Sequence, residues 1–207
     1  MRIVKRTDGT FVFAYHGELA GALNNFSKLC ALPGFWDVDH CFRKISASAN
    51  FDYLDLRNAI IEGISLWNHG INRLNAENAD MYWADIHEIV LSDCIFIRTL
   101  LQGAHIVDCQ FINCDFQQAD LSRDNLGGRT RIENSVFERC NFYNANLLGA
   151  LFDNVSFVGV DFTHAIVGED GIGHKTTYKN CVFKETALPR NKEVYDIVVE
   201  GERTAKS

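Results

Sequence analysis

Large apolar residues recur every five positions through most of the chain. The stretch CQFINCDFQQADL at 109–121 shows the pattern: Phe111, Phe116 and Leu121 are large and apolar, and the residue two positions before each is Cys or Ala. A helix repeats its face about every 3.6 residues and a strand every two, so a period of five fits neither. The chain is therefore read as an array of short repeats.

The period can be followed through residues 49–188, and we call the large residue of each unit its centre. The first block has sixteen apolar centres: Phe51, Leu56, Ile61, Leu66, Ile71, Ala76, Met81, Ile86, Leu91, Phe96, Leu101, Ile106, Phe111, Phe116, Leu121 and Leu126. One extra residue near Gly127 then shifts the register. It resumes at Ile132, Phe137, Phe142, Leu147, Phe152, Phe157, Phe162 and Val167, and returns after a longer irregular stretch at Tyr178, Phe183 and Leu188.

The repeat units include ANFDY, ADMYW, CDFQQ, ADLSR, CNFYN and ANLLG, which resemble the A(D/N)LXX consensus of the pentapeptide-repeat family. The resemblance implies an all-β fold, a right-handed quadrilateral β-helix in which four units make one coil. Coils would stack with centres in ladders. One predicted ladder holds Leu56, Ala76, Phe96, Phe116, Phe137 and Phe157, and the next holds Ile61, Met81, Leu101, Leu121, Phe142 and Phe162.

The two ends differ from the repeats, which predicts three segments. In residues 1–48, RIVKRT and TFVFAY flank Asp8-Gly9 as a β-hairpin, a helical spacing follows over 17–31, and Pro33-Gly34 ends it. We expect this segment to cap the β-helix of 49–188, although a separate recognition module is an alternative. Residues 189–207 hold VYDIVVEG, a candidate strand or dimerising segment, and a tail.

Composition narrows the class of protein. The chain has 207 residues, 47% of them hydrophobic, with seven cysteines and no stretch typical of a signal peptide or a membrane span. An odd number of cysteines is unusual for a secreted disulfide scaffold, so we expect a cytoplasmic protein. Cys94, Cys109, Cys114, Cys140 and Cys181 all fall at the small inward position, so we expect core packing and no metal site.

Charge is unevenly distributed along the repeats. Residues 49–126 hold 12 acidic and 4 basic residues, whereas the whole chain has a net charge of −7. A surface this acidic is not expected to bind nucleic acid directly, because phosphate binding requires Lys and Arg. No catalytic constellation or cofactor motif stands out, and a filled rod has no cleft for one, so we expect a binding protein rather than an enzyme.

The resemblance implies two functional alternatives. Some members of the family resemble B-DNA in width and charge and bind DNA gyrase or topoisomerase IV. Glu62, Asp80, Asp120 and Asp161 fall on one predicted face, which suits such an acidic DNA mimic. The alternative is a protein-interaction scaffold or regulator with no specified partner. A continuous negative face would favour the first, and an apolar outer patch would favour the second.

Two further features are candidate partner contacts. GGRT (127–130) and GEDGIGHKTT (168–177) could project as loops, and the second carries Lys175. Apolar residues also occur at outward positions: Ile95 and Ile97 flank one centre, and Trp67, Tyr82 and Trp83 lie nearby in the sequence. Soluble monomers seldom leave a large apolar patch bare, so the N-terminal helix, a second copy of the chain or a partner should cover it.

Overall fold

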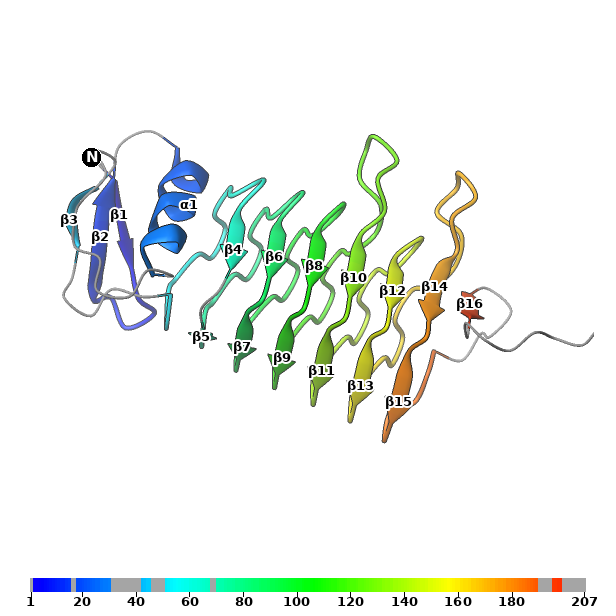
Figure 1. Ribbon diagram of the computed structural model, residues 1–207. Coiled ribbons are helices and arrows are strands. Elements are labelled where there is room, and N and C mark those ends of the chain that lie inside the picture. Colours follow the sequence, from blue (N-terminus) through cyan, green and yellow to red (C-terminus); the bar gives the residue numbers. More distant parts are fainter. Residues whose placement is uncertain are drawn as a thin grey trace, which may run out of the picture.

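The computed structural model describes residues 2–15, 18–30, 42–45, 51–67, 70–189 and 195–198, and it confirms the all-β repeat solenoid (Figure 1). Two parallel sheets run along the rod. The first, side A, contains β4 (Ser65–Trp67), β6 (Asp85–His87), β8 (His105–Val107), β10 (Arg131–Glu133), β12 (Leu151–Asp153), β14 (Thr176–Lys179) and β16 (Tyr195–Val198). The second, side B, contains β5 (Gly70–Asn72), β7 (Val90–Ser92), β9 (Gln110–Ile112), β11 (Val136–Glu138), β13 (Ser156–Val158) and β15 (Val182–Lys184).

Two further sides are held by single parallel bridges between coils. Side C links residues 55, 75, 95, 115, 141, 161 and 187, and side D links residues 60, 80, 100, 120, 146 and 166. Each coil therefore has four sides, one for each five-residue unit. The residue two positions after a centre turns the corner, and it takes a left-handed φ near that of Asn58 (57°) and Asn78 (56°). Asn tolerates this conformation better than most residues, because its short polar side chain can bond locally.

The centres fill the rod in stacked ladders. Phe96, Phe116 and Phe142 stack face to face, with ring centroids 4.9 and 4.8 Å apart. Phe111, Phe137 and Phe157 form the neighbouring ladder, with centroids 4.7 and 5.7 Å apart. Rings of adjacent ladders meet edge to face, as Phe111 and Phe116 do at 5.5 Å. Both arrangements are preferred by aromatic rings, so the interior is packed rather than hollow.

The predicted ladders are wrong after Phe116. The sequence pattern predicts that Leu126 is a centre and that a single residue is inserted after it. In the structure, Leu126 is 82% exposed. Asp115 pairs with Asn141, so six extra residues have entered and Phe116 is followed by Phe142. An insertion of one and an insertion of six leave the same five-residue phase. The sequence pattern therefore could not distinguish a small slip from a complete loop.

The N-terminal elements lie against the first coil. β1 (Arg2–Lys5) and β2 (Phe11–Tyr15) form the predicted antiparallel hairpin, and α1 (Leu19–Cys30) the predicted helix. The sequence missed β3 (Phe42–Ile45), which pairs with β2. Pro33-Gly34 lies outside the described residues. None of the described residues forms a helix long and apolar enough to cross a membrane.

Hydrogen bonds join these elements to the open edge of the first coil. On side C, the Asp55 N–H donates to the Lys5 carbonyl at 2.9 Å. On side A, Asn24 of α1 accepts from the Ser65 N–H at 2.7 Å. At the other end β16 pairs with β14, which extends side A by one strand. Edge groups that would otherwise attract another chain are thus occupied on these sides.

We predict that Phe116→Ala lowers the free energy of unfolding by about 3 to 5 kcal/mol, because it opens a cavity in a stacked ladder. Leu126→Ala is the matched control, since the sequence pattern gives both residues the same role but Leu126 is exposed. Urea denaturation measures both. Equal losses for the two variants would contradict the register described above.

Candidate functional site

Exposed apolar side chains gather on side D and the loops at its corner. The described residues include eleven exposed large hydrophobic side chains, and six belong to this region: Ile60, Trp83, Leu100, Leu126, Ile166 and Ile172. Ile60 is 73% exposed and Leu100 is 39% exposed. Solvent-exposed aliphatic groups scattered singly need no explanation, but a concentration on one side of a rod marks a contact surface.

Apolar and acidic residues alternate along the first four coils of side D, which continues with Asn146 and Ile166. The position before each centre holds Ile60, Asp80, Leu100 and Asp120 in four successive coils, and the bridges between them fix this order. We call these four residues the side D row. The position after each centre holds Glu62, Tyr82, Gln102 and Ser122. Side D therefore carries both apolar area and negative charge.

The carboxylates of side D have no ion-pair partner among the residues that the structure describes. Asp80 accepts a hydrogen bond from the Tyr82 N–H at 3.2 Å. Asp120 accepts from Ser122, from the amide of Gln102 at 3.0 Å and from the amide of Asn146 at 3.1 Å. Glu62 is exposed. These donors are neutral and do not cancel the carboxylate charges, so side D remains negatively charged toward a partner.

Two equivalent loops leave the rod at the corner between sides D and A (Figure 1). The chain takes eleven positions from Leu121 to Ile132 and again from Val167 to Tyr178, where a regular corner takes five. Thr130 and Thr176 close the loops in the same way, each donating its hydroxyl to a carbonyl of the coil before. Residues 122–130 are the first loop and residues 168–176 the second. The loop predicted at 168–177 is confirmed, and the loop predicted at 127–130 is longer than expected.

An aspartate organises each loop. Asp124 Oδ1 accepts from the N–H groups of Leu126 and Gly128 at 2.8 and 2.6 Å. Asp170 Oδ1 accepts from those of Ile172 and His174, both at 3.0 Å. Burial alone would raise the pKa of both carboxyl groups, but hydrogen bonds hold each pKa below its usual value, first from the Trp83 side chain for Asp124 and first from the Ile172 N–H for Asp170. The loops are therefore ordered around ionised carboxylates.

Each aspartate also reaches across a glycine to a donor further down the rod. Asp124 accepts from Trp83 Nε1 at 2.7 Å, passing over Gly103. Asp170 lies 3.7 Å from Arg123 Nε, passing over Gly149. A Cβ at Gly149 would come within 2.7 Å of the Asp170 Cβ, so only glycine fits there. The loops thus fold back over the corner of the rod.

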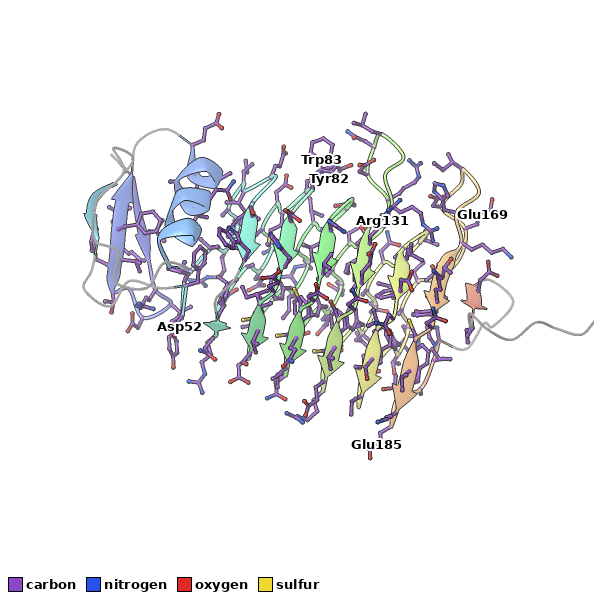
Figure 2. All side chains as sticks on the ribbon, in the orientation of Figure 1. Asp52, Tyr82, Trp83, Arg131, Glu169 and Glu185 are labelled. Carbon is purple, nitrogen blue, oxygen red and sulfur yellow. The ribbon has the colours of Figure 1, made fainter. Side chains whose placement is uncertain are left out.

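A recess of 340 Å³ lies between the loops, lined by Tyr82, Ser122, Arg123, Asp124, Asn125, Leu148 and Asp170. The Asn125 N–H donates to the Tyr82 hydroxyl, which ties the first loop to the aromatic pair of Tyr82 and Trp83. Figure 2 shows that pair and Glu169 at the edge of the rod that carries the loops. The lining carboxylates are already saturated by donors. Among the described residues, no group of three His, Cys, Asp or Glu side chains could hold a metal.

The structure separates the four predicted acidic residues. Glu62, Asp80 and Asp120 share side D, but Asp161 bridges Asn141 and Ala187 on side C. The six-residue insertion moves every later unit by one side relative to the sequence register. Exposed apolar residues also interrupt side D, so side D is not the continuous negative face that would favour a DNA mimic.

The predicted apolar contacts are also dispersed. Ile95 and Ile97 lie on side C and are half-buried between the coils before and after them. Trp67 ends β4 on side A and stacks on His87, with ring centroids 6.2 Å apart. Trp83 is exposed at the corner of side D. Lys175 Nζ lies 3.7 Å from Asp196 Oδ1 of β16, so its charge is directed toward the C-terminal strand.

Several residues of side D were missed from the sequence. Ile60 and Ile166 occupy the position before a centre, where the consensus has Asp or Asn. An apolar residue at that position was the available signal. Asp124 and Asp170 gave no signal, because Asp is common throughout the repeats.

The cysteines occupy the predicted small inward positions. Cys94, Cys109, Cys114 and Cys140 are buried free thiols, and Cys181 is half-buried. Burial raises the pKa of Cys109 to about 11, which keeps that thiol protonated. Four of these residues therefore serve the core alone, and Cys181 packs against it while part-exposed.

Comparison with known proteins identifies the repeats. Residues 94–126 and 131–167 match the family model for pentapeptide repeats, with 8 copies. No curated protein matches the sequence.

Several solved structures are similar to parts of this one. HetL, a pentapeptide repeat protein involved in heterocyst differentiation regulation from the cyanobacterium Nostoc, is 15% identical over 71% of this chain and 82% of its own, with a TM-score of 0.29. Full-length QnrB1, a plasmid-mediated fluoroquinolone resistance protein, is 11% identical over 70% and 81%, with a TM-score of 0.33. A pentapeptide repeat protein from the Arabidopsis thaliana thylakoid lumen is 21% identical over 56% and 67%, with a TM-score of 0.29.

We predict that Gly149→Ala destabilises the protein more than Gly63→Ala. Both glycines have a left-handed φ, +72° and +65°, so each substitution should cost about 1–2 kcal/mol of backbone strain. Only Gly149 adds a clash with Asp170, since nothing lies within 4 Å of a Cβ at Gly63. Urea denaturation gives the two costs, and limited proteolysis should show cleavage in 168–176 for Gly149→Ala alone. Similar costs and intact loops in both variants would show that Asp170 does not hold the second loop.

Proposed function

We propose that this chain, a pentapeptide-repeat protein, acts without catalysis by holding a protein partner on side D and its two loops. The observation that carries the proposal is that six of the eleven exposed large hydrophobic side chains among the described residues lie there. Burying such side chains against a partner would contribute about 25 cal/mol for each Å² removed from water. The acidic residues between them would select the partner by charge.

Two features favour binding over catalysis. The core of the rod is filled by stacked centres, so a deep cleft has no place in it. The carboxylates in the recess between the loops accept hydrogen bonds from backbone N–H groups and from Trp83 or His174. Such saturated groups order a loop well, but they are poor general bases because their proton affinity is lowered.

Rigidity also supports the proposal. Both loops are held by buried carboxylates and by contacts with the rod, so their exposed tips, Leu126 and Ile172, are presented in fixed positions. The Ile172 side chain reaches the first loop, where a Cβ at Gly127 would lie 3.2 Å from its Cδ1 atom. A surface ordered before binding loses less entropy when a partner docks.

A photo-crosslinking amino acid at Leu100 should therefore yield an adduct with a partner polypeptide in the native cell. The same amino acid at Val90 is the matched control. Val90 precedes a centre on side B and is 41% exposed, against 39% for Leu100. Adducts from Leu100 but not from Val90, analysed by mass spectrometry, are expected. Equal yields at the two positions, or none at Leu100, would argue against side D as the contact surface.

A second candidate is an acidic DNA mimic that acts on DNA gyrase or topoisomerase IV. It is favoured by the 12 acidic and 4 basic residues of 49–126. Binding by such a mimic would depend on the summed electrostatic field of the rod rather than on one unbroken acidic side. Charges beyond direct contact also steer association.

This candidate predicts that the purified protein inhibits gyrase supercoiling at micromolar concentration, and that duplex DNA and added salt both weaken the effect. Asp80→Lys combined with Asp120→Lys should weaken it further. An unchanged supercoiling rate, both with and without a quinolone, would remove these enzymes as partners.

A further inference from the structure

The side D row presents a repeating pattern along the rod axis: apolar, acidic, apolar, acidic. Ile60, Asp80, Leu100 and Asp120 lie in successive coils, one residue from each. Backbone hydrogen bonds between these coils hold the spacing, as from the Leu100 N–H to the Ala79 carbonyl at 3.0 Å. The row therefore presents one side chain per coil at a fixed spacing.

The spacing of the side D row is close to the rise of an α-helix per turn. Successive coils are about 4.8 Å apart, and a helix rises about 5.4 Å per turn, so three steps span about 14 Å on the rod and about 16 Å on a helix. In an extended strand, side chains on one face are about 6.6 Å apart, so three steps would span about 20 Å. One side chain per helical turn can therefore stay opposite each residue of the row, whereas the side chains of a strand are spaced too far apart to do so.

The surroundings of the row suit the same occupant. Tyr82 and Trp83 rise beside Asp80, and the first loop is bonded to both of them, so together they form a wall along the corner of sides D and A. Gln102 and Ser122 continue the floor beside the row. The Asp80 carboxylate has no ion-pair partner among the described residues, which leaves it able to bind a cation.

We propose that the element bound on side D is an amphipathic α-helix of a partner protein, lying along the rod axis. Its contacting face carries apolar residues at i and i+7, opposite Ile60 and Leu100. It carries Lys or Arg at i+4 and i+11, opposite Asp80 and Asp120. One residue per turn meets one residue per coil. This inference rests on the proposed function, because it names the partner of the same surface.

The test uses a fluorescent alanine-based helical peptide with Leu at i and i+7 and Lys at i+4 and i+11. A second peptide of the same composition has Leu at i and i+4 and Lys at i+7 and i+11. Fluorescence anisotropy with the full chain should show at least about tenfold tighter binding of the first peptide, a difference that corresponds to about 1.4 kcal/mol. Equal affinities for the two peptides would overturn the inference.

Charge reversal on the protein supplies the matched control. Asp80→Lys should weaken the first peptide at least about tenfold, and a peptide with Glu in place of Lys should bind this variant better than it binds the unmodified chain. Asp161→Lys should leave the affinity unchanged. Asp161 precedes a centre and accepts a hydrogen bond from the N–H two residues on, as Asp80 does, but it lies on side C. Equal effects of the two substitutions would show only general attraction to an acidic rod.

A second variant distinguishes loss of binding from unfolding of the protein. Leu100→Asp removes an exposed aliphatic group and should abolish the preference for the first peptide while the melting temperature is kept. The outcome is separable from that of the crosslinking experiment. Adducts at Leu100 with no preference between the peptides would leave side D as a contact surface and reject the helix. Absence of adducts would instead reject the proposed function.

Discussion

Backbone hydrogen bonds between successive coils hold every other feature of this protein in place. Asp80 donates to the Ala59 carbonyl, Leu100 to that of Ala79 and Asp120 to that of Thr99, at 2.8 to 3.0 Å. Because each coil is fixed in register on the one before, inward residues must stack into ladders and outward residues must form rows. A single coil could bury none of its centres, so the stack is the smallest stable unit.

Each loop leaves this hydrogen bonding intact, because the chain returns after the loop to the side that a regular corner would have reached. Each loop adds six residues at the corner between sides D and A, and the chain re-enters on side A: Ile106 pairs with Ile132, and Phe152 with Tyr178. The returning strands fix both ends of the loop, and Asp124 or Asp170 fixes its middle. The rod can therefore carry ordered projections at no cost to its core.

The same constraint fixes the arrangement of the outer surface. Side chains on side D keep their spacing whether or not a partner is present, since the backbone beneath them cannot slide. The alternation of aliphatic groups and carboxylates in the side D row is then a preformed pattern, and under the proposed function it would bind by complementarity rather than by rearrangement. Trp83 has two roles in this arrangement, because it anchors the first loop through Asp124 and also borders side D.

The sequence by itself determined which residues point inward. Its five-residue period identified the repeat solenoid, most of the centres, the inward cysteines, the hairpin and the helix, because inward and outward orientation is set locally within each unit. It did not determine which side a unit occupies after a loop, so Leu126 was placed in the core, Phe137 in the wrong ladder and Asp161 on the wrong side. Side assignment depends on hydrogen bonds between units twenty or more residues apart, and a period of five is unchanged by any whole unit added between them. The order of the side D row already follows from the twenty-residue spacing before the first loop, whereas the loop carboxylates and the recess were decided by long-range pairing.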